Sequence, residues 1–130
     1  MSFAHLTLAT RNVRRTADFY EKALGWPRVH TPENAPGHLN VAWVEIGPGG
    51  QQIHILHVPD YAPSPFENEF GRHFAVFHPV ADFPDLKRRL VEHGATLLDP
   101  IRPTPFERFL FRDFNGYVFE VIAAEQYVRE

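Results

Sequence analysis

The chain of 130 residues repeats one arrangement of elements in its two halves, and this internal repeat constrains the fold more than any other feature. Each half opens with a short stretch of alternating apolar residues, continues with an amphipathic helical pattern and ends in three extended stretches. The spacing between matching positions is nearly constant, because His73 follows His5 by 68 residues and Gly94 follows Gly25 by 69. Each half is therefore predicted to form a βαβββ module.

Two helices are predicted from apolar residues spaced three and four apart. These residues are Val13, Ala17, Tyr20 and Leu24 in the first half and Phe83, Leu86 and Leu90 in the second. Asn12 is expected to cap the first helix, because its side chain can accept a hydrogen bond from a free backbone N–H. Gly25 and Gly94 are expected just past the two helix ends, where the left-handed conformation favours glycine.

The predicted strands cover most of the remaining chain. They are Phe3–Ala9, Pro27–His30, Asn40–Ile46 and Gln52–Val58 in the first half, and His73–Phe77, Thr96–Leu98, Arg108–Arg112 and Val118–Ala123 in the second. Tight turns at 47–50 and 113–116 join the last two strands of each half. The proline-containing stretch 59–72 is predicted to be a linker, which gives modules at about 1–58 and 73–130 within a single domain.

The composition excludes several classes of function. A net charge of −3 gives no basic surface for nucleic acid or anionic membranes, and no apolar run is long enough to cross a bilayer. With no secretion signal, a cytoplasmic protein is expected. The chain has no cysteine but eight histidines. Any metal site must therefore use imidazole and carboxylate ligands.

Four metal-capable side chains occupy two pairs of repeat-related positions. His5 and His73 lie near the start of the first strand of each half, while His54 and Glu120 each lie four residues after equivalent glycines in the final hairpins. Glu120 lies in an apolar strand, so its carboxylate needs a cation, a strong donor or a proton. Two interpretations stay open for it: a metal ion, or a salt bridge to Arg108 or Arg112. The other five histidines are expected at the surface or outside a ligand set: His30, His38, His57, His78 and His93.

Two stretches of the sequence resemble a known family. They are His5–Ala9 together with Asp18–Trp26, and Phe111–Glu120 with its D-x-x-G-x-x-x-E pattern. They are similar to the opening strand and helix and to the closing hairpin of the vicinal oxygen chelate superfamily, also called the glyoxalase/bleomycin resistance/dioxygenase superfamily. The resemblance covers essentially the whole chain. It implies an α+β fold in which two tandem βαβββ modules form a half-open mixed β-barrel.

The resemblance also implies a function. The family's metal ligands fall on His5, His54, His73 and Glu120, which would hold one divalent ion: Zn, Ni, Co, Mn or Fe(II). The expected protein is a metal-dependent lyase or isomerase that acts on a small, vicinally oxygenated substrate by chelation and proton transfer, with Glu120 as catalytic base. His57, Tyr61 and Arg108 are weaker candidates for substrate contacts. By analogy with the family we expect a homodimer, with the site built within one chain or by exchange between two.

Departures from the family keep other functions open. His54 stands where glyoxalase I enzymes typically supply a second carboxylate, and Ala9 stands near the position of an arginine that often binds glutathione. A ring-cleaving dioxygenase or an epoxide-opening resistance enzyme would use only three ligands. The alternative from a different class is a metal-free, bleomycin-resistance-type binding protein. Its ligand would lie in a dimer groove lined by Trp43, Phe66, Phe70, Phe106 and Phe109.

Overall fold

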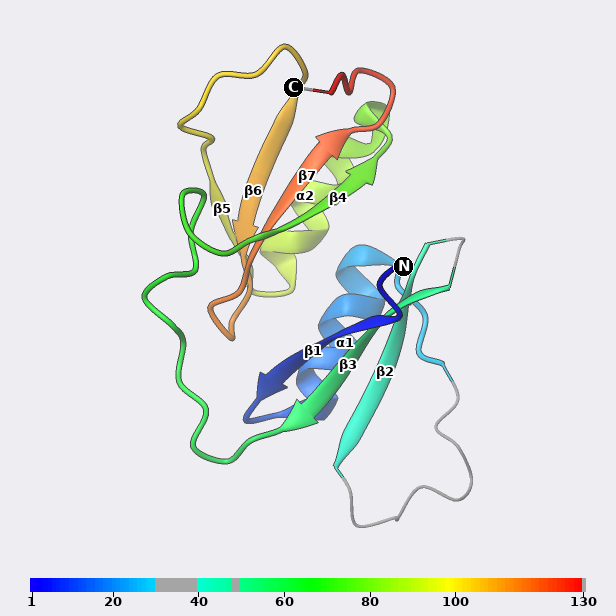
Figure 1. The fold of residues 1–130 in the computed structure, drawn as a ribbon, viewed down its shortest axis with the longest axis vertical. Coiled ribbons are helices and arrows are strands. Elements are labelled where there is room, and N and C mark those ends of the chain that lie inside the picture. Colours follow the sequence, from blue (N-terminus) through cyan, green and yellow to red (C-terminus); the bar gives the residue numbers. More distant parts are fainter. Residues whose placement is uncertain (30–39, 48–49, 130) are drawn as a thin grey trace. The chain divides into compact units, whose positions relative to one another are not determined.

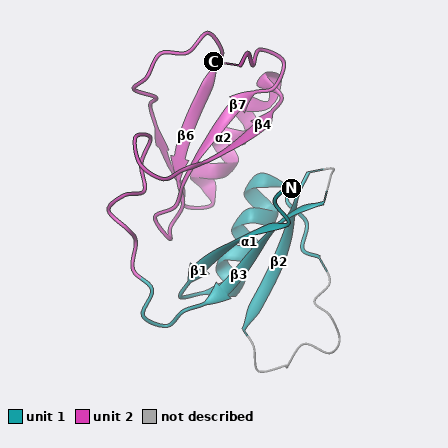
Figure 2. Cartoon of the chain, viewed as in Figure 1, with its two compact units in different colours: residues 1–61 teal, residues 62–130 magenta. Residues whose placement is uncertain are grey.

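The computed structural model describes residues 1–29, 40–47 and 50–129, and the chain divides into two compact units, residues 1–61 and 62–130 (Figure 2). The first unit contains β1 (His5–Thr10), α1 (Val13–Leu24), β2 (Val41–Ile46) and β3 (Gln51–His57). The second contains β4 (Phe74–His78), the short 3-10 helix η1 (Val80–Asp82), α2 (Phe83–Glu92), β5 (Thr96–Leu98), β6 (Arg108–Arg112) and β7 (Val118–Ala123).

The first sheet has the order β1-β3-β2, with β1 parallel and β2 antiparallel to β3. A short segment extends it beyond β2, because Arg28 forms a bridge with Val44 and the Val29 N–H donates to the Trp43 carbonyl. This segment is the part of the predicted strand Pro27–His30 that the structure describes. His30 and the predicted turn residues 48 and 49 lie outside the described residues.

The second sheet has the order β4-β7-β6-β5, with β4 parallel to β7 and the other neighbours antiparallel. β7 is an interior strand buried along its whole length, which fits a sequence that is apolar except for Glu120. Each unit has one helix on one face of its sheet (Figure 1). Neither sheet closes on itself within the described residues, and the predicted α+β class with two half-open, mixed βαβββ modules is confirmed.

The helices begin and end where the sequence predicts. Asn12 is the N-cap of α1 and its side-chain oxygen accepts a hydrogen bond from the Arg15 N–H. Gly25 follows α1 with φ of 72°, in the left-handed region. The apolar faces of both helices are buried in their own units, including Ala17 and Tyr20 on α1 and Leu90 on α2.

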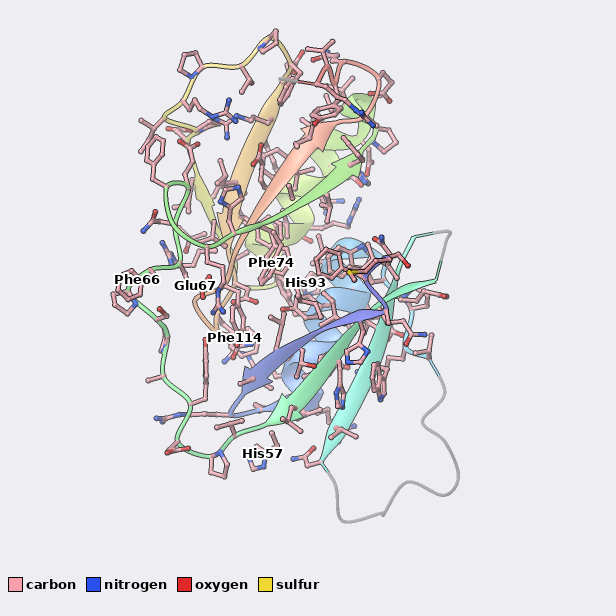
Figure 3. The ribbon with its side chains drawn as sticks, viewed as in Figure 1. His57, Phe66, Glu67, Phe74, His93 and Phe114 are labelled. Atoms are coloured by element: carbon pink, nitrogen blue, oxygen red, sulfur yellow. The ribbon has the colours of Figure 1, made fainter. Side chains whose placement is uncertain are left out.

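Residues 66–72 of the segment between β3 and β4 form a tight loop, in which the Arg72 N–H donates to the Phe66 carbonyl. Glu67 is almost completely buried, and its Oε1 accepts from Nε and Nη2 of Arg72. Arg112 donates from Nη1 to the Glu67 and Gly116 carbonyl oxygens, which ties the loop to the β6–β7 hairpin. Phe66, beside Glu67, projects outward instead (Figure 3). The loop is therefore fixed to the second sheet by the hydrogen bonds of Arg112, and the Glu67–Arg72 pair closes the loop on itself.

Candidate metal centre

The first pair of predicted ligands lies on one face of the β1-β3-β2 sheet. Alternation along β3 places Ile53 and Ile55 in the core and leaves His54 on the opposite face. His5 pairs with Gln52 across the parallel β1–β3 ladder, so its side chain shares the face of His54. The two imidazole rings have centroids 5.9 Å apart and planes at 86°. The unit thus brings His5 and His54 together as predicted.

A tryptophan completes this pair. Trp43 lies directly opposite His54 in the β2–β3 ladder, and the two rings stack with centroids 3.9 Å apart and an interplanar angle of 4°. The edge of His5 meets the same indole at 4.9 Å and 83°. Burial lowers the pKa of His54, and the neighbouring charge of His5 lowers it further. Both effects favour neutral imidazole, the form that binds a metal ion.

The second pair lies at the β4–β7 edge. Nε2 of His73 is 3.0 Å from Oε2 of Glu120, and the Glu120 side chain is only 6% exposed. Nδ1 of His73 is also buried, and it has no hydrogen-bond partner among the described residues. A buried nitrogen without a partner is costly in a folded protein unless a ligand completes it. The second unit thus brings His73 and Glu120 together as predicted.

The alternative prediction for Glu120, a salt bridge to Arg108 or Arg112, is also met in part, because Arg108 lies beside it. Nη1 of Arg108 is 3.5 Å from Oε1 of Glu120 and 3.0 Å from Oε1 of Glu69. Leu110 lies directly opposite Glu120 in the β6–β7 ladder. Arg108 is two residues before Leu110 on the same face of β6, so it is the diagonal neighbour of Glu120. Arg112, the other candidate, instead donates to backbone carbonyls. Glu120 therefore has a cationic neighbour that it shares with a second carboxylate.

Glu69 is held by backbone donors as well as by Arg108. Its carboxylate accepts from the N–H groups of Ile101 and Arg102, at 2.9 to 3.1 Å. Burial by itself raises the pKa of Glu69. The Arg102 and Ile101 N–H groups and the Arg108 guanidinium outweigh it, so the pKa lies below its ordinary value. Glu69 is thus an ionised carboxylate beside the His73–Glu120 pair.

The two pairs occupy the same place in their modules. Thr7, two residues after His5, pairs with His54 across the β1–β3 ladder. Ala75, two residues after His73, pairs with Glu120 across the β4–β7 ladder. The register of the backbone thus reproduces the repeat that the sequence spacing predicts. In neither unit do three or more His, Asp or Glu side chains of the described residues form a metal-binding group by themselves.

The remaining candidates lie elsewhere. His57 ends β3 on the face opposite His54, and it lies at the lower end of that strand in Figure 3. Nε2 of His78 is 2.7 Å from Oδ2 of Asp82, and His93 is the C-cap of α2. Of the side chains proposed for a ligand groove, Phe106 and Phe109 are buried in the second unit, while Phe66 and Phe70 are exposed. His38, like His30, lies outside the described residues.

The donor set fits a divalent ion. Three imidazoles and one carboxylate are ligands that Zn, Ni, Co, Mn and Fe(II) accept. In the first unit the lowered pKa keeps His54 neutral, and in the second unit a buried imidazole nitrogen lacks a partner. Glu69, in the linker, was not among the residues predicted from the sequence. Trp43 was predicted only as part of an apolar groove, although a tryptophan opposite a histidine in adjacent predicted strands indicates contact between them.

Comparison with known proteins agrees with the fold. No curated protein matches the chain. Fosfomycin resistance protein FosX from Listeria monocytogenes, in one crystal form, has a TM-score of 0.76 at 18% identity and covers 99% of this chain and 98% of its own. A variant of that protein, in complex with Mn(II) and 1S,2S-dihydroxypropylphosphonic acid, has a TM-score of 0.72 at 18% identity and covers 94% of this chain and 89% of its own.

A protein from Bacillus anthracis assigned to the glyoxalase family has a TM-score of 0.72 at 21% identity and covers 94% of this chain and 93% of its own. In the described part of the chain no helix has the length and apolar character needed to span a membrane. The family model of the Glyoxalase/Bleomycin resistance protein/Dioxygenase superfamily matches residues 2–121. The chain belongs to this superfamily.

Proposed function

We propose that the protein is a divalent-metal-dependent enzyme of the glyoxalase type, a lyase or isomerase acting on a small substrate with two neighbouring oxygens. The observation that carries the proposal is the pair of equivalent two-residue half-sites, His5 with His54 and His73 with Glu120, at matching registers of the two modules. Together, one His5–His54 pair and one His73–Glu120 pair would supply four ligands to a metal ion. Two coordination positions would then remain for the substrate oxygens. A divalent ion, when bound, supplies a Lewis acid that stabilises negative charge on a substrate oxygen.

The chain's own residues supply the proton chemistry. Glu120 is the single carboxylate of the proposed ligand set, so we assign it the role of base. Nε2 of His73, 3.0 Å from Oε2 of Glu120, is within hydrogen-bond distance and holds this carboxylate in place. Burial of Glu120 excludes water from its oxygens and makes its interactions with charge stronger than at the surface. Trp43 holds the His54 ring in one plane.

The test is the metal content of the protein purified without chelators, measured by elemental mass spectrometry. We expect one transition metal ion per chain, which is lost in His54→Ala and in Glu120→Ala. His57→Ala is the matched control, because His57 lies on the same strand as His54 but on the opposite face. Failure to bind metal after incubation with Ni, Zn, Mn and Fe(II) would favour the metal-free binding protein of the same superfamily. Unchanged metal content and turnover in Glu120→Gln would exclude Glu120 as ligand and base.

Substrate screening follows once metal is shown. Small α-hydroxycarbonyl compounds test the lyase or isomerase reaction. Fosfomycin tests the epoxide-opening alternative. This alternative is worth testing because fosfomycin resistance proteins share the fold of this chain. Turnover of fosfomycin alone would replace the lyase or isomerase assignment with an epoxide-opening one.

We also propose that the protein works as a homodimer. If the half-sites are exchanged between chains, His5 and His54 of one chain join His73 and Glu120 of its partner. Mixing a His5→Ala chain with a Glu120→Ala chain would then restore one complete site per heterodimer and part of the metal binding. A site built within each chain predicts no restoration, because every chain in the mixture lacks one ligand.

A further inference from the structure

Glu69 connects three parts of the second unit through one buried carboxylate. It comes from the loop between β3 and β4, and its side chain is only 9% exposed. Both of its oxygens accept the Ile101 N–H, and Oε2 also accepts the Arg102 N–H at 2.9 Å. Its Oε1 is 3.0 Å from Nη1 of Arg108. These contacts fix the Glu69 carboxylate in one position, so that its negative charge lies beside the Arg108 guanidinium.

Arg108 has little contact with solvent and lies between two carboxylates. Its side chain is 2% exposed, and Nη1 is 3.0 Å from Glu69 but 3.5 Å from Glu120. Nη2 donates to the Arg102 carbonyl, whereas Nε is buried without a hydrogen-bond partner among the described residues. The shorter of the two carboxylate contacts is therefore the one to Glu69. An arginine held in this way is only partly engaged with Glu120.

The charges of Arg108, Glu69 and Glu120 do not cancel. Arg108 contributes one positive charge, and Glu69 and Glu120 contribute two negative charges when both are ionised. We propose that Glu69 is a positioning residue that neutralises Arg108, so that Glu120 keeps an uncompensated negative charge for a divalent cation. This inference rests on the proposed metal-dependent function. Without Glu69, the buried guanidinium would face Glu120 alone and compete with a metal ion for the carboxylate.

The proposal predicts opposite effects for single and double charge changes. Glu69→Gln removes a negative charge and leaves Arg108 paired with Glu120, so metal affinity falls. Adding Arg108→Gln to this variant removes the competing positive charge and returns the surroundings of Glu120 to a net negative charge. Metal affinity should then recover. A purely structural role for Glu69 predicts the reverse, because a second buried substitution would add its damage to the first.

The experiment is titration of the 130-residue protein with Mn(II) alone, with the heat of binding measured by calorimetry. Relative to wild type, Glu69→Gln should weaken Mn(II) binding by roughly 10- to 100-fold, as outer residues of metal sites do when altered. Glu69→Asp keeps the charge and should retain most of the affinity. The matched control is Glu92→Gln, since Glu92 lies in the same unit and pairs on the surface with Arg88. That control should bind Mn(II) like wild type.

Each outcome decides a separate question. Wild-type affinity in Glu69→Gln would overturn the positioning role while leaving the metal site in place. Weaker binding in the double variant than in Glu69→Gln would also overturn it and assign Glu69 to structure. If Glu69→Gln does not fold, as judged by circular dichroism, loss of affinity in folded Glu69→Asp would overturn the charge argument. No binding of Mn(II) by wild type, or of the other metals tested above, would overturn the proposed function itself.

Discussion

The indole of Trp43 lies flat on the imidazole of His54, with ring centroids 3.9 Å apart and planes within 4° of each other. The relationship follows from register, because the two residues are directly opposite in the antiparallel β2–β3 pair. A stacked ring restricts rotation of His54 about its side-chain bonds and shields one face from water. The orientation of this proposed ligand is therefore set before any ion arrives.

This stacking makes Trp43 a reporter of metal binding. The chain has two tryptophans, and the other, Trp26, is buried in the first unit, where it contacts Tyr20. We expect Mn(II) to quench the tryptophan fluorescence of wild type and of Trp26→Phe, because Trp43 touches both His5 and His54. Trp43→Phe should lose the response. Equal quenching in Trp43→Phe would show that the ion does not bind beside the His5–His54 pair.

Most of the fold could be predicted because its signals are local. The Asn12 cap, the glycine after α1 and the apolar spacing of α2 each depend on residues within one or two turns of helix. The apolar residues around Glu120 predicted the strand that is β7. The segment after α1 was predicted as a full strand, but in the described residues it pairs through one bridge, at Arg28. Its extent depends on a neighbouring strand that local sequence does not encode.

The candidate site divides in the same way. The proximity of His5 to His54 and of His73 to Glu120 could be predicted because the repeat placed His5 and His73, and His54 and Glu120, at equivalent positions. Glu69 could not, because it approaches Arg108 only when the 59–72 linker folds back over β6. Its partners Ile101 and Arg102 are more than thirty residues away in sequence. A contact made through a loop has no periodic pattern, so spacing alone gives no sign of it.

The hairpin that carries Glu120 depends on Gly116. This residue has φ of 90°, and a Cβ there would lie 2.7 Å from Cβ of Pro63. Gly25 offers a matched control, since it has φ of 72° and a Cβ added to it would meet no atom within 4 Å. Gly25→Ala should cost about 1 kcal/mol of unfolding free energy from conformation alone. Gly116→Ala should cost roughly 1–3 kcal/mol more because of the clash. Urea denaturation measures both, and equal losses would contradict the steric argument.

The same turn is held by a buried carboxylate. Oδ1 of Asp113 accepts hydrogen bonds from the Asn115 and Tyr117 N–H groups, both at 2.9 Å. Asp113→Ala leaves two buried donors without this acceptor and should lower the unfolding free energy by about 1–3 kcal/mol. Asp113→Asn keeps a carbonyl oxygen in place and should lose less. Thermal unfolding compares the variants. An equal loss in the two would mean that the negative charge of Asp113, rather than its hydrogen bonding, stabilises the turn.

The ion pairs at the start of α2 should make stability depend on pH. A hydrogen bond from His78 lowers the pKa of Asp82; burial opposes this shift, and Arg89 adds to it. Because the folded-state pKa lies below the unfolded value, the stabilisation is fully present above the unfolded pKa and is lost as pH falls through the folded one. Asp82 is 40% exposed, so screening limits the effect to at most about 1 kcal/mol.

Asp82→Asn removes this contribution and should lower the urea midpoint at pH 7. The difference from wild type should shrink as the pH falls below about 4, the unfolded pKa of an aspartate, and through the lower folded-state pKa of Asp82. Val91→Ala serves as a control, because Val91 is an exposed, uncharged residue of the same helix whose effect on stability should not vary with pH. A deficit for Asp82→Asn that stayed constant from pH 7 to pH 2 would assign its effect to the start of the helix and not to the ion pairs with His78 and Arg89.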